Sequence, residues 1–199
     1  MDIAELFVRS EEASTMTPER RILVATLDCI AELGLQGATV RLIASKAGLN
    51  AAAVNYYYRS KDRLMEAALR YAWTHVSEDI DRIVASTKDG REGLETAVRF
   101  LIEGAHQYPA IIRAILVEEP GLRREAGAFF KDLFERLGVK AGSGVEPGLG
   151  TALLLALSTF IGLAPEAFAA LSGRNPDDAG ERDRLAADIT PWLFRIPPV

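Results

Sequence analysis

The residue types best suited to specific recognition are concentrated between positions 39 and 63. This stretch holds five basic side chains and one acidic one, a net charge of +4, whereas the whole chain of 199 residues carries −5 at pH 7. Three consecutive tyrosines (56–58) and two asparagines, Asn50 and Asn55, lie among the cations. Basic groups neutralise phosphates, and asparagine side chains can bond to base edges. The pattern favours a surface that contacts DNA. The alternative is a helical hairpin with a solvated basic face.

Other kinds of chemistry have little material in this sequence. The one cysteine, Cys29, lies on the apolar side of a predicted helix, and a single cysteine excludes both an internal disulfide and a CxxC zinc site. The two histidines, His75 and His106, leave few ligands for a metal centre. No Ser-His-Asp arrangement, phosphate-binding loop or metal-ligand cluster is recognisable. We therefore predict that the protein is not an enzyme and has no catalytic residue, no cofactor and no metal.

The basic stretch can act only if two short helices hold it. A helix-turn-helix needs a small residue where the helices cross, a residue that tolerates positive φ in the turn, and a branched apolar residue in the second helix. Ala44, Gly48 and Val54 supply these in that order, and Leu49 fills the inside of the turn. This spacing predicts a helix-turn-helix at residues 40–58.

The same segment carries a family resemblance. Residues 54–64 (VNYYYRSKDRL) resemble the signature of the TetR family of bacterial transcription regulators, as do residues 38–44 and 47–50. The resemblance covers residues 20–70, and the rest of the chain matches in length and in being all-helical. The family often has His at position 57 and Phe at position 58, where this chain has tyrosine. Tyr58 can keep the core position of that ring if its hydroxyl finds a partner.

The resemblance implies an all-α fold with an N-terminal three-helix DNA-binding domain and a larger C-terminal helical domain for ligand binding and dimerisation. We predict a flexible arm at residues 1–16, the DNA-binding domain at 17–62, and the effector-binding and dimerisation domain at 63–199. Helical periodicity and end signals predict about nine helices and no strand. These helices cover residues 18–33, 40–47, 51–57, 61–84, 91–107, 109–117, 121–137, 149–171 with a bend at Pro165, and 177–194.

Roles in DNA binding follow from the motif and the resemblance. The second helix would enter the major groove N-terminal end first, with Asn50, Ala51, Ala52 and Asn55 facing base edges. Asparagine can read adenine, and alanine can pack on thymine methyl groups. The partner would be double-stranded DNA with a palindromic operator.

Phosphate contacts are expected from residues that flank the second helix of the motif, here called the reading helix. The resemblance supports Thr39, Tyr56 and Lys61 in this role, and Arg41 would contact the backbone or the groove edge. Lys61 falls in the first turn of a helix, whose free amides also attract phosphate. Tyr57 completes the predicted DNA-binding set. Arg59 and Arg63 either contact DNA or are simply solvated.

One long apolar segment lies in the C-terminal part. Residues 149–164 carry no charge, but sixteen residues fall short of the roughly 20 that span a bilayer, and the flanking charges are acidic. We predict no membrane partner and, because the N-terminus lacks a basic start and an apolar run, a cytoplasmic location. Residues 149–171 and 181–196 are predicted to form a four-helix interface in a homodimer. The alternative is a core helix of a monomer.

Aromatic side chains and one histidine on the body helices are the candidate effector site, and they would bind a small apolar or aromatic molecule. The alternative is that they only fill the core. The function expected is a sequence-specific transcriptional regulator, a repressor that an effector releases from its operator. An activator and a helical carrier without DNA binding remain alternatives. The candidate ligand residues are Trp73, Phe100, His106, Tyr108, Phe130 and Phe134.

Overall fold

The computed structural model describes residues 16–87, 89–137, 140–141 and 146–195, and these are helical apart from loops and two strands of two residues each. The all-α prediction is confirmed. All but Met16 of the predicted arm at residues 1–16 lies outside the described residues. The described residues form ten α-helices and one π-helical segment, η1: α2 (Pro18–Gly37), α3 (Val40–Lys46), α4 (Ala51–Tyr58), α5 (Lys61–Ser86), α6 (Gly90–Gln107), α7 (Pro109–Arg113), η1 (Ala114–Glu118), α8 (Pro120–Arg136), α9 (Pro147–Leu163), α10 (Pro165–Ser172) and α11 (Ala179–Leu193).

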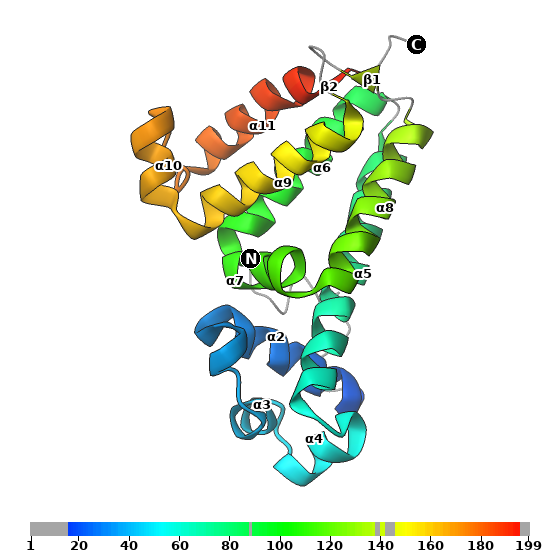
Figure 1. Ribbon diagram of the computed structural model, residues 1–199, viewed down its shortest axis with the longest axis vertical. Helices are drawn as coiled ribbons and strands as arrows, with labels where there is room; N and C mark the ends of the chain where they lie inside the picture. Colours follow the sequence, from blue (N-terminus) through cyan, green and yellow to red (C-terminus); the bar gives the residue numbers. More distant parts are fainter. Residues whose placement is uncertain (1–15, 88, 138–139, 142–145, 196–199) are drawn as a thin grey trace.

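The helices form two groups joined by α5 (Figure 1). Helices α2, α3 and α4 lie around the first turns of α5 at one end of the molecule, and α6 to α11 form the other end. With 26 residues, α5 is about 39 Å long at 1.5 Å per residue. It packs against α2 in the first group and against α6 and α8 in the second, and α7 also packs against α2. The two groups therefore touch through two different helices.

The predicted helix starts are present. The hydroxyl groups of Thr17, Thr39 and Ser60 each accept a hydrogen bond from the backbone N–H three residues further on, at 3.2–3.3 Å. Each bond satisfies an N–H group that the start of a helix leaves without a partner. Gly34, predicted to end the first helix, has φ +71° and breaks the helical path of α2. Residues 35–37, predicted as a loop, instead form a helical turn beyond this kink.

The apolar segment at residues 149–171 is two helices rather than one. The chain bends by 114° between α9 and α10, at the predicted Pro165, which has no N–H group to continue a helix. Among the described helices, none is long and apolar enough by itself to cross a membrane, and α9 and α10 meet that test only as a bent pair.

Two features of the second group were not predicted. Residues 140–141 pair antiparallel with residues 194–195 as β1 and β2, with Ala141 opposite Phe194. A strand of two residues is too short to show an alternating pattern. The predicted helix at residues 109–117 is divided into α7 and the π-helical η1. Wider π turns within helices are frequent at functional sites.

Helix α6 is the centre of the second group, where it packs against α5, α9 and α11. At Gly162, α9 approaches α6 so closely that an added Cβ would overlap the carbonyl group of Ala105. On the α11 side, the buried Arg182 donates from Nε to Glu103 at 2.6 Å and from Nη2 at 3.1 Å. Burial raises the pKa of Glu103, but the hydrogen bonds and charge of Arg182 outweigh burial and leave that pKa below its usual value. This ion pair ties α11 to α6.

Candidate DNA-binding surface and body cleft

The helix-turn-helix has the predicted local geometry. Ala44 and Val54 are buried at the crossing of α3 and α4. Gly48 has φ +66°, a value that glycine adopts without strain. Leu49 is partly buried against the core, and its N–H donates to the carbonyl oxygen of Ala44 at 2.9 Å. The turn therefore holds α4 at the outer end of the molecule, away from α6 to α11 (Figure 1).

The residues predicted to face base edges lie at the start and middle of α4. Ala52 and Asn55 are exposed, and Ala51 is partly exposed. Asn50 is the N-cap of α4, and its Oδ1 accepts from the N–H of Ala53 at 2.9 Å. Sequence reasoning missed this cap, although asparagine before a helical run is a recognised signal for one. The cap occupies the oxygen of Asn50 and leaves its amide nitrogen as the group able to reach a base.

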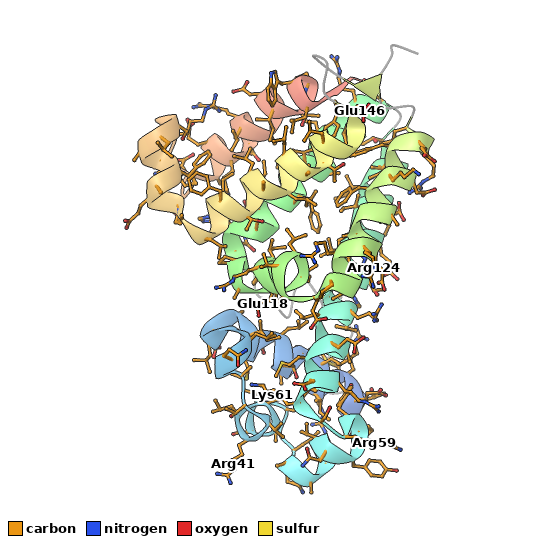
Figure 2. All side chains as sticks on the ribbon, in the orientation of Figure 1. Arg41, Arg59, Lys61, Glu118, Arg124 and Glu146 are labelled. Atoms are coloured by element: carbon orange, nitrogen blue, oxygen red, sulfur yellow. The ribbon has the colours of Figure 1, made fainter. Side chains whose placement is uncertain are left out.

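The residues predicted to hold phosphates surround α4. Tyr56 is 81% exposed and Tyr57 is 41% exposed, with ring centroids 5.5 Å apart. Lys61 donates from Nζ to the carbonyl oxygen of Gln36 at 3.2 Å, so it also holds the last turn of α2, beyond the kink at Gly34. Thr39 is exposed beside its capping bond. Figure 2 shows Arg41 extending outward from α3, at the same end of the molecule.

Arg59 and Tyr58 give the reading helix its C-terminal boundary. Arg59 ends α4 with φ 59°, and it is the one described non-glycine residue with positive φ. Nothing in the sequence indicates this conformation. The hydroxyl of Tyr58 donates to the carbonyl oxygen of Glu19 at 3.4 Å, so the partner that this tyrosine needs is present. Burial raises the pKa of Tyr58, with the charge of Glu19 acting in the same direction.

Most cations of residues 39–63 form no ion pair with a carboxylate among the residues that the structure describes. Lys46 is an exception, because its Nζ lies 2.6 Å from Glu32 Oε1 and this hydrogen bond raises the pKa of the lysine. Of the other four cations in the stretch, none forms an ion pair with a carboxylate among the residues described; they are Arg41, Arg59, Lys61 and Arg63. Figure 2 places Arg41 and Arg59 on opposite sides of this end. The surface can therefore attract a polyanion without first breaking internal ion pairs.

Three of the predicted ligand residues form a buried aromatic cluster. Trp73 on α5 lies 6.2 Å from Phe130 on α8, and Phe130 lies 6.1 Å from Phe134, measured between ring centroids. Phe194 continues the cluster, 4.7 Å from Phe134. The three predicted residues are each less than 10% exposed. These rings pack α8 against α5, and their role in ligand binding stays a prediction.

The other three predicted ligand residues are separate from that cluster. Phe100 and Tyr108 line an apolar cavity of about 30 Å³ beside α5 and α6, far smaller than the roughly 300–1,000 Å³ of small-molecule sites. His106 does not line this cavity, and its Nε2 lies 3.8 Å from Asp177 Oδ1. The six residues therefore do not surround one space.

A larger opening lies between η1, α8 and α9. This cleft has a volume of about 650 Å³, within the range of small-molecule sites, and none of the six predicted ligand residues lines it. Its walls are mostly aliphatic and small residues, including Leu116, Ala152 and Leu155. Such residues give no chemical signal in a sequence, and only the packing of α9 against η1 and α8, which lie earlier in the chain, brings them together.

Large apolar side chains are exposed along α9, α10 and α11. Leu149 and Leu153, one turn apart on α9, are 55% and 39% exposed, and Leu163 further along α9 is 48% exposed. On the neighbouring elements, Leu171 of α10 is 81% exposed and Trp192 of α11 is 56% exposed. An apolar surface that extends over adjacent helices usually marks a contact with another molecule.

Metal ligands and reactive thiols contribute little to either region. In the part of the chain that the structure describes, no three His, Cys, Asp or Glu side chains lie together as metal ligands would. Cys29 is a buried free thiol in α2, and burial raises its pKa. A thiol with a raised pKa is less readily ionised and so less reactive.

Comparison with known sequences gives a family profile that matches the motif and its flanking residues. Residues 22–68 match the profile of bacterial regulatory proteins of the tetR family. The HTH-type transcriptional regulator BetI 1 of Chromohalobacter salexigens is 33% identical over 97 residues, which are 49% of this chain and 46% of that protein. BetI of Serratia proteamaculans is 36% identical over 67 residues, 33% of this chain and 34% of that protein. The matched part thus spans less than half of each relative.

The similarity to solved structures extends over most of the chain, whereas the sequence matches to the two relatives cover less than half of it. A TetR family transcription regulator from Marinobacter aquaeolei superposes with a TM-score of 0.65 and 18% identity, covering 90% of this chain and 96% of that one. AibR in complex with isovaleryl coenzyme A and operator DNA gives a TM-score of 0.64 and 18% identity, with coverage of 88% and 99%. SmeT, the repressor of the Stenotrophomonas maltophilia multidrug efflux pump SmeDEF, gives 0.63 and 16%, with coverage of 94% and 98%. At such identities the likeness shows the fold.

Proposed function

We propose that this protein, whose residues 22–68 are a domain of the tetR family of bacterial regulatory proteins, is a sequence-specific DNA-binding transcriptional regulator that a small-molecule effector releases from its operator. The observation that carries the proposal is the arrangement of side chains around α4, at the outer end of the molecule. There, the exposed helix α4 belongs to a helix-turn-helix, and four cations in and beside that motif form no ion pair with a carboxylate among the residues described. The family to which the domain belongs regulates transcription, and we propose no enzymatic activity for the chain.

The domain boundary proposed at residues 62 and 63 falls in the first turn of α5. Residues 17–62 then hold the motif, and residues 63–199 hold the effector site and the dimer contact. Because α5 belongs to both parts, a change in the packing of the second group can move the first. The effector would favour a conformation in which two reading helices no longer match half-sites about 34–36 Å apart, which is one turn of DNA.

A homodimer supplies the second reading helix. The exposed leucines of α9 and α10, with the exposed Trp192 of α11, support an isologous interface through residues 149–171 and 181–196. The partner copy would cover apolar surface that water otherwise contacts. A palindromic operator is the expected DNA partner, because the symmetry of a dimer requires matching half-sites. We propose that the protein acts in the cytoplasm, where such DNA is found.

Fluorescence anisotropy on DNA that flanks the gene for this protein tests the proposal. Titrations against that DNA and against scrambled DNA, each at two salt concentrations, should show binding that is selective and salt-sensitive. If no selective binding appears, a genome-wide selection of DNA fragments follows. A selection that returns no enriched sequence would overturn the proposal and favour a helical carrier, a function that the cleft of about 650 Å³ could serve.

Lys61→Ala should weaken binding to every DNA sequence. The variant removes one phosphate contact, so the negative slope of log K against log salt should become less steep by about 0.9. Lys131→Ala on α8 is a matched control, since Lys131 is an exposed lysine in the second group. Because Lys61 also bonds to Gln36, thermal melting should accompany each titration. Equal slopes for wild type and Lys61→Ala would reject the phosphate contact.

Asn55→Ala should change sequence preference more than nonspecific affinity. Asn55 is exposed in the middle of α4, and a good bidentate contact to a base contributes about 1–3 kcal/mol of discrimination. Binding to a panel of single-base operator variants measures this directly. The discrimination at one base position should decrease while the salt slope stays constant, the opposite of the result expected for Lys61→Ala. A uniform loss on all sequences would contradict base reading by Asn55.

A further inference from the structure

The cleft between η1, α8 and α9 combines an apolar wall with a single charge. Leu116 and Val117 of η1 and Leu155, Phe160 and Leu163 of α9 supply most of the large side chains that line it. Among the described residues that line the cleft, Arg123 of α8 carries the only formal charge. We propose that this cleft binds an elongated amphipathic monocarboxylate, with its apolar body along α9 and its carboxylate on the guanidinium of Arg123.

The shape of the cleft favours an elongated ligand. Gly148 and Leu163 both line it and stand at opposite ends of α9. Fifteen residue steps separate them, which correspond to about 22 Å along a helix at 1.5 Å per residue. The volume of about 650 Å³ is thus distributed along a trough rather than concentrated in a round chamber.

The cleft walls suit the apolar part of a ligand, because few of the side chains that line them form hydrogen bonds. The hydroxyl of Thr159 donates to the carbonyl oxygen of Leu155 at 2.7 Å within α9, so its proton is already engaged. The large residues are aliphatic apart from Phe160. Burial of an alkyl chain against them contributes roughly 0.8 kcal/mol for each CH₂ group removed from water. A polar or sugar-like body would lose its bonds to water here without replacement.

Arg123 is available to an anion. Its Nη1 donates to the carbonyl oxygen of Leu116 at 3.2 Å, which holds the guanidinium beside η1. No carboxylate among the described residues forms an ion pair with it, whereas nearby Arg113 is paired with Glu118 at 3.3 Å. A guanidinium matches a carboxylate with two parallel hydrogen bonds. One arginine balances one charge, which favours a carboxylate over a doubly charged phosphate.

The position of the cleft also allows a bound ligand to affect the DNA-binding group of helices, α2 to α4. Leu116 and Val117 belong to η1, which directly follows α7, and α7 packs against α2. A ligand that displaces η1 would therefore act on the first helix of the DNA-binding group. This regulatory meaning rests on the proposed function, whereas binding of the carboxylate by Arg123 can be measured without DNA.

Three chain-matched probes test the ligand class: dodecanoate, dodecan-1-ol and dodecylamine. Titration calorimetry on the full chain, below the concentrations at which the probes aggregate, should show dodecanoate binding most tightly and dodecylamine most weakly. Arg123→Gln should raise the dissociation constant for dodecanoate about tenfold or more, because it removes a charge-assisted bond, and leave that for dodecan-1-ol nearly unchanged. Arg124→Gln is the matched control, since Arg124 is exposed on the same helix and does not line the cleft (Figure 2).

Glycines on α8 allow the cleft to be filled without disturbing the fold. A Cβ added at Gly127, which lines the cleft, would meet no atom within 4 Å, and the same holds at Gly121, which does not line it. Gly127→Leu should abolish binding of both dodecanoate and dodecan-1-ol, whereas Gly121→Leu should leave both unchanged. Melting curves of the two variants show whether each is folded.

The possible outcomes separate this proposal from the proposed function. Arg123-dependent binding of dodecanoate that leaves DNA affinity unchanged supports the ligand site and contradicts effector release. Absence of dodecanoate binding in a protein that binds DNA selectively overturns the ligand site and leaves the regulator intact. If Arg123→Gln and Gly127→Leu alter dimer dissociation instead of probe binding, a second copy of the chain occupies the cleft, and the proposal is rejected.

Discussion

Ala52→Glu should lower the affinity for operator DNA by about a hundredfold or more. Ala52 is exposed in the first turn of α4, the turn expected to enter the major groove. A carboxylate there faces phosphates and base acceptors, and like charges brought together at an interface cost several kcal/mol. The fold should persist, because a negative charge near the N-terminus of a helix is favourable. Anisotropy with the wild-type operator measures the loss.

The control for this variant is Ala128→Glu, at an exposed alanine of α8 in the other group of helices. It changes the net charge of the chain by the same amount and should leave operator affinity within about twofold, because charges beyond a Debye length of about 8–10 Å are largely screened. Melting temperatures of both variants should match the wild type. Normal operator binding by folded Ala52→Glu would show that α4 does not enter the groove.

Leu153→Glu should convert the dimer to a monomer and thereby weaken operator binding. Leu153 is 39% exposed on α9 and does not line the cleft, so the variant tests the interface without touching the ligand site. An unpaired charge buried between two protomers costs about 3–5 kcal/mol, which raises the dimer dissociation constant more than about a hundredfold. A monomer also loses the gain from reading two half-sites at once, commonly a factor of about 10² or more.

Analytical ultracentrifugation over a range of concentrations measures this change. Leu33→Glu serves as the control for oligomeric state, because Leu33 is 51% exposed on α2 and outside the proposed interface. The control should remain dimeric, and both variants should retain the helical content of the wild type. A wild-type protein that sediments as a monomer, or a Leu153→Glu variant that stays dimeric at low concentration, would contradict an interface on this face of α9.

The motif that carries the proposed function could be predicted because its determinants are local. Ala44, Gly48 and Val54 lie within eleven consecutive positions, and the caps Thr39 and Ser60 bond only three residues away. Backbone φ at a glycine and hydrogen bonds within one turn depend on neighbours in the chain. The partner of Tyr58 was anticipated as a requirement, although its identity as the carbonyl of Glu19 depends on how α2 packs.

The cleft proposed as the ligand site could not be predicted in the same way. Periodicity assigned apolar residues to helix faces, and this information does not say which faces meet. The aromatic residues and the histidine chosen for their chemistry are divided among a packed cluster, a cavity of about 30 Å³ and a position beside Asp177. The larger cleft is instead lined by small and aliphatic residues of η1, α8 and α9, together with Arg123.

The sequence by itself thus determined the fold class, the helix-turn-helix and the charge that surrounds it, because caps, turn residues and periodicity act over a few residues. Tertiary structure alone decided two other features: the cleft between η1, α8 and α9, and the placement of Arg123 against η1 without an ion pair to a described carboxylate. The cleft depends on the distances from α9 to η1 and α8, which lie earlier in the chain. Such distances arise from the packing of many side chains together, and no local pattern encodes them.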